Sequence, residues 1–286
     1  WFWYRGRARF VFTPSFHTLP LSRWWIRPIN ALICRVVDRV ISLTRLEAGL
    51  ARRAYWVRRG KQGVIGWGAT PPDATRSSTA ETAGHAPDGA GDPAVVTILC
   101  VGRLGRHKGQ LWLLDVYRQA RSQFRRPVRL VLVGRDEGDA AAVNTFIADR
   151  GLQSEVTVTG EVSDGELAEL YAEADIFTLF SHYEAFGLVY FEAMAHGAPV
   201  LTHDVGANRE LLGRGAVVVP RYDREAAGRE MVRLVNDDLF RLQARHMVEA
   251  CSGTRSVICT LDEAIHTLKI NQAALASAGE RVVRID

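Results

Sequence analysis

The chain has 286 residues, of which 47% are hydrophobic and 24% are charged, and its formal net charge is +4. A chain of this length and composition folds into one or two globular units, which excludes a disordered protein. Arginine or aspartate interrupts the apolar stretches before the roughly 18 residues that a membrane-spanning helix needs, and no signal-peptide pattern opens the sequence.

The positive charge is concentrated at the start of the chain, where the first 70 residues hold 13 arginines and lysines against two acids. Such a basic region attracts anionic membranes, nucleic acid or acidic substrates, and an ordinary solvated surface is the alternative. The sequence has no helix-turn-helix, zinc-finger or RNA-binding signature, so nucleic acid is not an expected partner. The four cysteines lack the spacing of zinc ligands, which favours reduced thiols and a cytoplasmic location.

Residues 1–72 are expected to form part of an α/β domain. In chain order they contain a strand within residues 7–16, a helix that begins near Pro28, a strand at 39–44 and a helix at 45–57. About 70 residues are too few for a whole doubly wound domain, which typically takes roughly 100 to 150. Because the first residue is tryptophan rather than methionine, we expect a fragment or a truncated reading frame.

Residues 73–94 are rich in Ser, Thr, Ala, Gly and Pro, so they are expected to be a flexible linker. Beyond them, apolar strands alternate with helices in a domain that we place at residues 95–270, followed by a tail at 271–286. The expected strands are 94–102, 128–134, 155–160, 175–181, 199–203 and 216–220, and the expected helices are 109–123, 139–151, 164–174, a segment around Glu192, and 208–212.

The alternation of strands and helices indicates the fold class. The strands are continuously apolar, which is typical of a parallel sheet that is covered on both faces. Ser163 and Glu166 have the spacing of a capping box at the start of the helix over 164–174. The sequence therefore predicts a doubly wound, Rossmann-like α/β domain, preceded by a partial domain of the same kind.

Two acids, Glu184 and Glu192, lie around the start of the helix after the fourth strand of this domain. Eight helical positions rise by about 12 Å, so these carboxylates are too far apart to share a proton. They are well spaced to hold two hydroxylated groups at the ends of a diphosphate, a sugar at Glu184 and a ribose at Glu192. The alternative is a loop acid and a solvated helix residue. The amides of Gly187 and Leu188 are candidate phosphate donors, because a glycine lets the backbone approach a ligand.

A bound diphosphate needs cations, and residues 151–208 contain no lysine or arginine. Arg103, Arg106 and Lys108 lie in a glycine-bounded turn after the first strand of the domain, where α/β folds bind phosphate. A solvated turn is the alternative. The turn matches neither the P-loop nor the dinucleotide-binding glycine motif.

Together these motifs resemble those of the retaining glycosyltransferases of family 4, whose GT-B fold has two Rossmann-like domains that face each other across a cleft. The resemblance is carried by "GRLGRHKG", "VLVGRDEGD", "VTVTGEVSDGELAELYAEADIFTLFS" and "EAFGLVYFEAMAHGAPVLTHDVGANREL", and it covers about residues 95–220. It implies a hexosyl-type transferase that moves a sugar from a nucleotide-diphosphate sugar to a glycan, lipid or small-molecule acceptor. Retention of configuration and independence of metal ions or other cofactors are also implied, and the sequence has no Asp-x-Asp pair.

The resemblance assigns roles to individual residues. Arg103 and Lys108 correspond to the residues that hold the diphosphate, Glu192 to the one that binds the ribose, and Glu184 to the one that contacts the transferred sugar. Backbone contacts are implied for Phe186, Gly187 and Leu188, and a place beside the base for Glu161 and Val162. His17, in "VFTPSFHTLPLSR", matches a histidine that faces the cleft, and a loop histidine without a role is the alternative.

The resemblance is incomplete at both ends. Nothing corresponds to the glycine-rich loop and early strands that receive the acceptor in the family's first domain, and residues 251–268 depart from the family's terminal helices. Two alternatives therefore stay open: a non-catalytic protein that keeps the donor fold for binding or assembly, and an epimerase of similar fold. The Arg-rich helix that starts near Arg23, Trp24 and Trp25 is expected to contact anionic lipid, which would place the protein peripherally at the inner membrane face.

Overall fold

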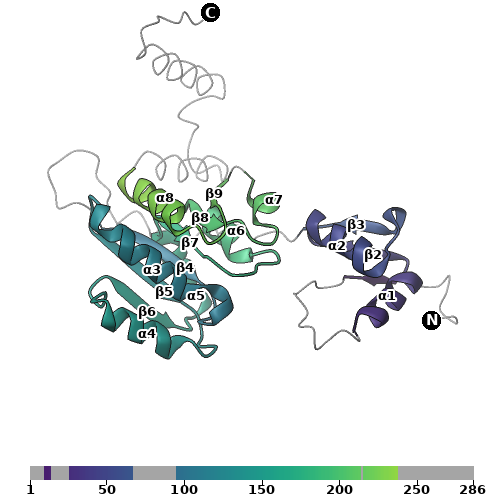
Figure 1. Ribbon diagram of the computed structural model, residues 1–286, viewed down its shortest axis with the longest axis horizontal. Helices are drawn as coiled ribbons and strands as arrows, with labels where there is room; N and C mark the ends of the chain where they lie inside the picture. Colours follow the sequence, from purple (N-terminus) through teal and green to yellow (C-terminus); the bar gives the residue numbers. More distant parts are fainter. Residues whose placement is uncertain (1–9, 14–25, 67–94, 214, 238–286) are drawn as a thin grey trace, which may run out of the picture.

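The computed structural model describes residues 10–13, 26–66, 95–213 and 215–237. These residues form two parallel sheets with helices packed on them (Figure 1). The predicted linker at 73–94, the predicted tail at 271–286 and the residues near Arg23 that were expected to contact lipid lie outside the described residues. The domain boundaries of the sequence analysis therefore stay predictions.

The larger sheet has six parallel strands in the order β6-β5-β4-β7-β8-β9. Its strands are β4 (Val96–Val101), β5 (Val128–Val133), β6 (Val156–Gly160), β7 (Ile176–Thr178), β8 (Val200–His203) and β9 (Ala216–Val219). The strand order reverses between β4 and β7, so the topological switch point of the sheet lies there. Every residue of β4 is buried, as its continuous apolar sequence predicts.

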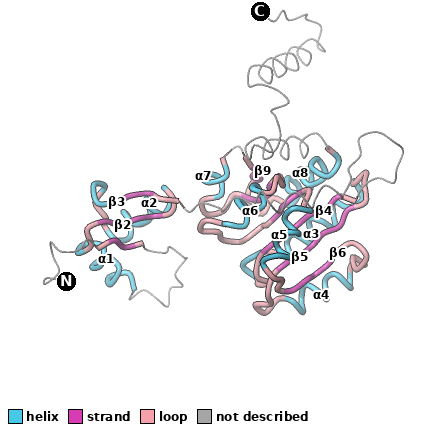
Figure 2. The backbone as a smooth tube through the Cα atoms, turned by 180° about the vertical axis from the view of Figure 1, so that it is seen from behind, coloured by secondary structure: helices cyan, strands magenta, loops and turns pink. Residues whose placement is uncertain are grey.

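Helices cover both faces of this sheet, which confirms the doubly wound α/β prediction. They are α3 (Gln110–Ala120), α4 (Ala140–Asp149), α5 (Asp164–Glu173), α6 (Leu188–Ala195), α7 (Asn208–Leu212) and α8 (Arg224–Asn236). Crossovers between parallel strands are right-handed, and those of this sheet run in opposite directions from the switch point. This arrangement puts α3 and α4 on one face of the sheet and α6 and α7 on the other. Figures 1 and 2 show the sheet from these two sides. The predicted capping box at Ser163 and Glu166 is present at the start of α5.

The smaller sheet is parallel, with the order β1-β2-β3. Its strands are β1 (Val11–Phe12), β2 (Arg39–Ser42) and β3 (Gln62–Val64), and its helices are α1 (Ile26–Val36) and α2 (Arg45–Tyr55), with a 3-10 turn at Arg59–Lys61. A separate small core fills it, made of Ala31, Cys34, Val37, Val40, Ala51, Tyr55 and Val57. The predicted strands and helices of this part are therefore present in an α/β unit.

A carboxylate of the larger domain forms hydrogen bonds with the backbone of the smaller α/β unit. Glu210 of α7 accepts hydrogen bonds from the backbone amides of Arg45 at 2.6 Å and Leu46 at 3.0 Å. These amides belong to the first turn of α2, which has no intrahelical partner for them and carries a partial positive charge. The Thr44 side chain caps the next part of the same turn by accepting from the Glu47 amide. The larger domain thus supplies a hydrogen-bond acceptor for two backbone amides in the first turn of α2.

The carboxyl ends of β4 to β9 all meet at one edge of the larger sheet, because the strands are parallel. The two loops that follow β4 and β5 are in close backbone contact there: a Cβ atom added to Gly134 would lie 2.2 Å from the carbonyl oxygen of Gly102. Arg103 and Lys108, which follow β4, and Glu184, which follows β7, lie at this edge.

Candidate functional site

The turn between β4 and α3, residues 102–109, is fixed by backbone contacts on two sides. Gly109 has a φ angle of +73°, and a Cβ atom there would lie 2.2 Å from the Phe180 carbonyl oxygen, so glycine is required for both conformation and space. The amide of His182 donates to the His107 carbonyl oxygen at 2.7 Å. The Gln110 side-chain amide donates to the Gly102 and Arg103 carbonyl oxygens from inside the turn. The cations of the turn therefore project from a rigid backbone.

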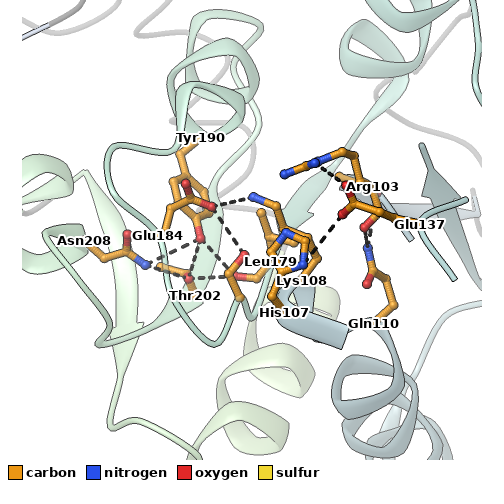
Figure 3. A network of polar contacts seen from close by, with 12 residues as sticks. Arg103, His107, Lys108, Gln110, Glu137, Leu179, Glu184, Tyr190, Thr202 and Asn208 are labelled. Atoms are coloured by element: carbon orange, nitrogen blue, oxygen red, sulfur yellow. Dashed lines mark hydrogen bonds and ion pairs between the residues drawn. The ribbon is translucent and has the colours of Figure 1, made fainter. Parts of the chain in front are cut away.

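Two of the predicted site residues form an ion pair across the switch point. The Lys108 Nζ atom lies 2.8 Å from Glu184 Oε2, and only 17% and 12% of the two side chains are exposed (Figure 3). Ser181 also donates to this carboxylate, at 3.4 Å. The contact joins the turn after β4 to the loop after β7, 76 residues further along the chain. Lys108 and Glu184 thus act as one charge-neutral unit at the carboxyl edge.

Close backbone packing holds the loop that carries Glu184. Gly206 has a φ angle of +53°, and a Cβ atom there would lie 1.9 Å from the Glu184 carbonyl oxygen. Gly187, with φ +72°, would place a Cβ atom 2.4 Å from the Tyr190 ring. The buried Tyr190 ring and the positive φ angle therefore both require glycine at 187, and close approach of the backbone to a ligand there stays a prediction.

A buried hydrogen-bonded network lies beneath this loop and was not predicted. The Thr202 hydroxyl donates to the Leu179 carbonyl oxygen at 2.7 Å, and the Tyr190 hydroxyl is within 3.2 Å of both groups. The Asn208 side-chain amide donates to Thr202 and to the His203 carbonyl oxygen (Figure 3). Burial raises the pKa of Tyr190, so its hydroxyl stays protonated. Tyr190, Thr202 and Asn208 lie in the motif that carries Glu184 and Glu192, but their spacing in the sequence does not predict that they contact one another.

Arg103 forms an ion pair with Glu137, a residue that sequence reasoning missed. Glu137 lies in the loop after β5, and its other carboxylate oxygen is 3.8 Å from His107 Nδ1 (Figure 3). This pair is more exposed than the first, at 46% and 35% for the two side chains. Burial and the neighbouring Lys108 lower the pKa of His107, which favours its neutral form at neutral pH. Arg103 and Lys108 thus have separate carboxylate partners.

Glu192 lies on α6 and accepts a hydrogen bond from the Tyr171 hydroxyl at 2.8 Å. Burial and the Glu192 charge raise the pKa of Tyr171, so it remains a hydrogen-bond donor. The Tyr171 ring stacks on His196, with 5.5 Å between ring centroids. Glu192 is therefore oriented by a buried tyrosine, with part of its side chain exposed.

The remaining predicted residues occupy different environments. Phe186 is buried and packs against Phe191, while Gly187 is the N-cap of α6 and Leu188 its first residue. Glu161 follows β6 and is exposed, and Val162 is half-buried against the core. His17 lies outside the described residues.

His203, the last residue of β8, has structural contacts. His203 is fully buried, and its Nε2 atom lies 2.6 Å from the Ser181 carbonyl oxygen, to which it donates. Burial lowers the pKa of His203 and keeps the ring neutral at neutral pH. Among the described residues, no group of three or more His, Cys, Asp or Glu side chains is arranged to hold a metal ion.

A family model described as "Glycosyl transferases group 1" matches residues 95–237, which is half of the chain and includes every site element after β4. Among curated proteins, mannosylfructose-phosphate synthase of Agrobacterium fabrum is 29% identical over 221 residues, or 71% of this chain and 46% of that protein. D-inositol 3-phosphate glycosyltransferase of Xylanimonas cellulosilytica is 33% identical over 215 residues, or 70% of this chain and 49% of that protein. The chain therefore spans about half the length of these relatives.

The fold recurs in solved structures of GT-B glycosyltransferases. A protein of Anabaena, solved in complex with UDP and glucose, superposes with a TM-score of 0.64 at 21% identity. The match covers 85% of this chain and 67% of the Anabaena chain. At this identity the likeness establishes the fold alone.

Proposed function

The chain belongs to the glycosyl transferases group 1, and we propose that it transfers a sugar from a nucleotide-diphosphate sugar to an acceptor. The observation that carries the proposal is the Lys108–Glu184 pair at the switch point of the sheet. Ligands of doubly wound folds bind outside the carboxyl ends of the strands at that point. A cation for phosphate and a carboxylate for hydroxyl groups stand side by side there, which is what a sugar diphosphate requires.

In the proposed complex the donor lies along the carboxyl edge. Lys108 and Arg103 bind the diphosphate, and Glu184 accepts hydrogen bonds from the transferred sugar. The ribose hydroxyls bind Glu192, which Tyr171 orients at 2.8 Å. Gly187 and Leu188, at the positive end of the α6 dipole, offer backbone contacts. Phe186 adds a backbone contact, and Glu161 and Val162 lie beside the base.

The chemistry follows from where charge develops. Cleavage of the bond between the sugar and the diphosphate leaves negative charge on the departing nucleotide. Arg103 and Lys108 project from a turn whose backbone is held by hydrogen bonds, so they are positioned to stabilise that charge. We propose that the reaction needs no metal ion because these fixed cations supply the charge. The retaining course, the hexosyl donor and membership of family 4 belong to the same proposal and rest on the motif resemblance.

Transfer of a labelled sugar tests this proposal. The chain is incubated with labelled UDP-glucose or GDP-mannose and with acceptors that the names of its relatives suggest, such as D-inositol 3-phosphate, hexose phosphates and phosphatidylinositol. We expect a labelled product whose formation falls at least about 100-fold in Glu184→Gln. The control is Glu173→Gln, which also removes one carboxylate but lies in an exposed ion pair with Arg129.

The products also distinguish the alternatives. Nucleotide binding without any product would favour a non-catalytic binding protein. Interconversion of the sugar on its nucleotide, independent of acceptor, would favour an epimerase. Equal product formation in wild type and Glu184→Gln would remove Glu184 from the reaction.

We further propose that the protein contacts anionic lipid peripherally, from the cytoplasmic side. Within the described residues, no helix is long and apolar enough to span a membrane. The support for surface contact is α1, where Ile29, Leu32 and Val36 share one exposed face with 49%, 61% and 39% of each residue exposed. Arg35 lies on the same helix and is also exposed. Apolar side chains bordered by arginine suit an anionic bilayer surface.

Co-sedimentation with vesicles tests this contact. We expect the chain to pellet with phosphatidylserine-containing vesicles at low salt and to be released at high salt, because surface charges are screened. Leu32→Glu should reduce pelleting, whereas Leu50→Glu, an exposed leucine of α2, should leave it unchanged. Equal pelleting with neutral and anionic vesicles would exclude the proposed electrostatic contact.

A further inference from the structure

We propose that Glu137 competes with the donor's diphosphate for Arg103, so that a nucleotide binds by displacing the Glu137 carboxylate from the guanidinium group. The inference rests on the proposed function, because it assumes that a diphosphate occupies the turn between β4 and α3. It adds a residue that limits how tightly, and for how long, the nucleotide product is held.

The backbone of Glu137 is attached directly to this turn. The Glu137 amide donates to the Leu104 carbonyl oxygen at 2.9 Å, and the Leu104 amide donates to the Arg135 carbonyl oxygen at 2.8 Å. Leu104 and Asp136 form a parallel β-bridge between the two loops. The Glu137 Cα atom therefore has a fixed position beside the turn.

The Asp136 side chain holds the loop after β5 in place through hydrogen bonds to the loop's own backbone. Its carboxylate accepts from the amides of Gly138 at 2.8 Å and Ala140 at 3.0 Å. These hydrogen bonds lower the pKa of Asp136, so it stays ionised and keeps the loop closed at neutral pH. The location of Glu137 thus follows from the construction of the loop.

From that position the Glu137 carboxylate lies over the turn. One oxygen pairs with the Arg103 guanidinium group, and the other is 3.8 Å from His107 Nδ1. A Cβ atom added to Gly105 would lie 3.2 Å from Glu137 Oε2. The absence of a side chain at position 105 therefore leaves room for the Glu137 carboxylate. Carboxylate and phosphate oxygens bind a guanidinium group with the same geometry. A diphosphate oxygen that takes the Nη1 position of Arg103 must therefore replace this carboxylate.

The two ion pairs of the site differ in how easily they exchange partners. Lys108 and Glu184 are largely buried, so separating them leaves poorly solvated charges. Arg103 and Glu137 are partly exposed, and ion pairs in such positions contribute little net stability. Arg103 is therefore the cation that changes partner when a diphosphate binds. The displaced carboxylate stays tethered nearby and repels the phosphate charge, which favours release of the nucleoside diphosphate product.

Titration with nucleotides tests the inference. Uridine, guanosine and adenosine diphosphates are titrated into wild type and Glu137→Gln by calorimetry, with the uncharged nucleosides in parallel. We expect Glu137→Gln to bind the preferred diphosphate about tenfold tighter, with a slower dissociation rate, because one repulsive and competing charge is removed. Affinity for the nucleoside should not change. Glu173→Gln, which removes a carboxylate paired with Arg129, should bind like wild type.

The outcomes separate this inference from the proposed function. Unchanged or weaker diphosphate binding by a folded Glu137→Gln variant overturns the inference and leaves the donor site standing, since Glu137 would then only orient Arg103. Equal tightening in Glu173→Gln also overturns it, because the effect would come from overall charge. Absence of diphosphate binding in wild type and Glu137→Gln alike overturns both. Circular dichroism and thermal melting establish that the variants are folded.

Discussion

Lys108→Met should destabilise the domain by about 3 kcal/mol, and adding Glu184→Met should restore most of that stability without restoring nucleotide binding. The reason is that the two side chains form a largely buried pair at 2.8 Å. Removing the lysine leaves the Glu184 carboxylate buried without its cation, whereas removing both leaves no unpaired charge. Diphosphate affinity should fall on the order of 100-fold in both variants, because the phosphate loses a fixed cation.

Urea unfolding of the wild type, both single variants and the double variant measures this coupling as a double-mutant cycle. Arg103→Met is the matched control: its ion pair with Glu137 is partly exposed, so the free energy of unfolding should change by less than about 1 kcal/mol. Additive losses in the double variant would show that Lys108 and Glu184 do not stabilise each other. Wild-type diphosphate affinity in the double variant would remove Lys108 from the donor site.

Gly206→Ala should cost on the order of 4 kcal/mol and displace the loop that carries Glu184. A Cβ atom at 206 would lie 1.9 Å from the Glu184 carbonyl oxygen, which no side-chain rotation relieves. The φ angle of +53° adds backbone strain for any residue with a Cβ atom. Because Glu184 must shift, nucleotide-sugar binding should weaken together with stability.

Gly151→Ala separates the strain from the clash. Gly151 has a φ angle of +61°, but a Cβ atom added there would have no neighbouring atom within 4 Å. Its substitution should therefore cost only the left-handed strain, about 1 kcal/mol. Chemical denaturation of both variants gives the comparison. A similar loss of stability in the two variants would mean that the contact between Gly206 and Glu184 relaxes without cost.

The fold was largely predictable because its signals are local. The strands from β4 to β9 are short apolar segments separated by helices, and the capping box at Ser163 and Glu166 is a spacing that a single helix end determines. Lys108 and Glu184 were singled out from a basic turn and an acidic motif, and their role in binding a donor stays a prediction. Their direct pairing was not, because it joins loops 76 residues apart.

The residues that escaped prediction depend on long-range contacts. Glu137 reaches Arg103 only because the loops after β4 and β5 are joined by backbone hydrogen bonds. Glu210 caps α2 from a position 164 residues away from Leu46. A charged residue in a loop has no periodicity that would indicate its partner. The hydrogen-bonding and ion-pair partners of such residues depend on which strands lie side by side in the sheet, and the sequence pattern does not report this.

The most direct test of a donor site at the carboxyl edge is a crystal structure of the chain with a nucleoside diphosphate. We expect the diphosphate to bind between Arg103 and Lys108, the ribose hydroxyls to contact Glu192, and the Glu137 carboxylate to be turned away from Arg103. A nucleotide bound at another surface, with Arg103, Lys108 and Glu192 directed away from it, would contradict the donor site.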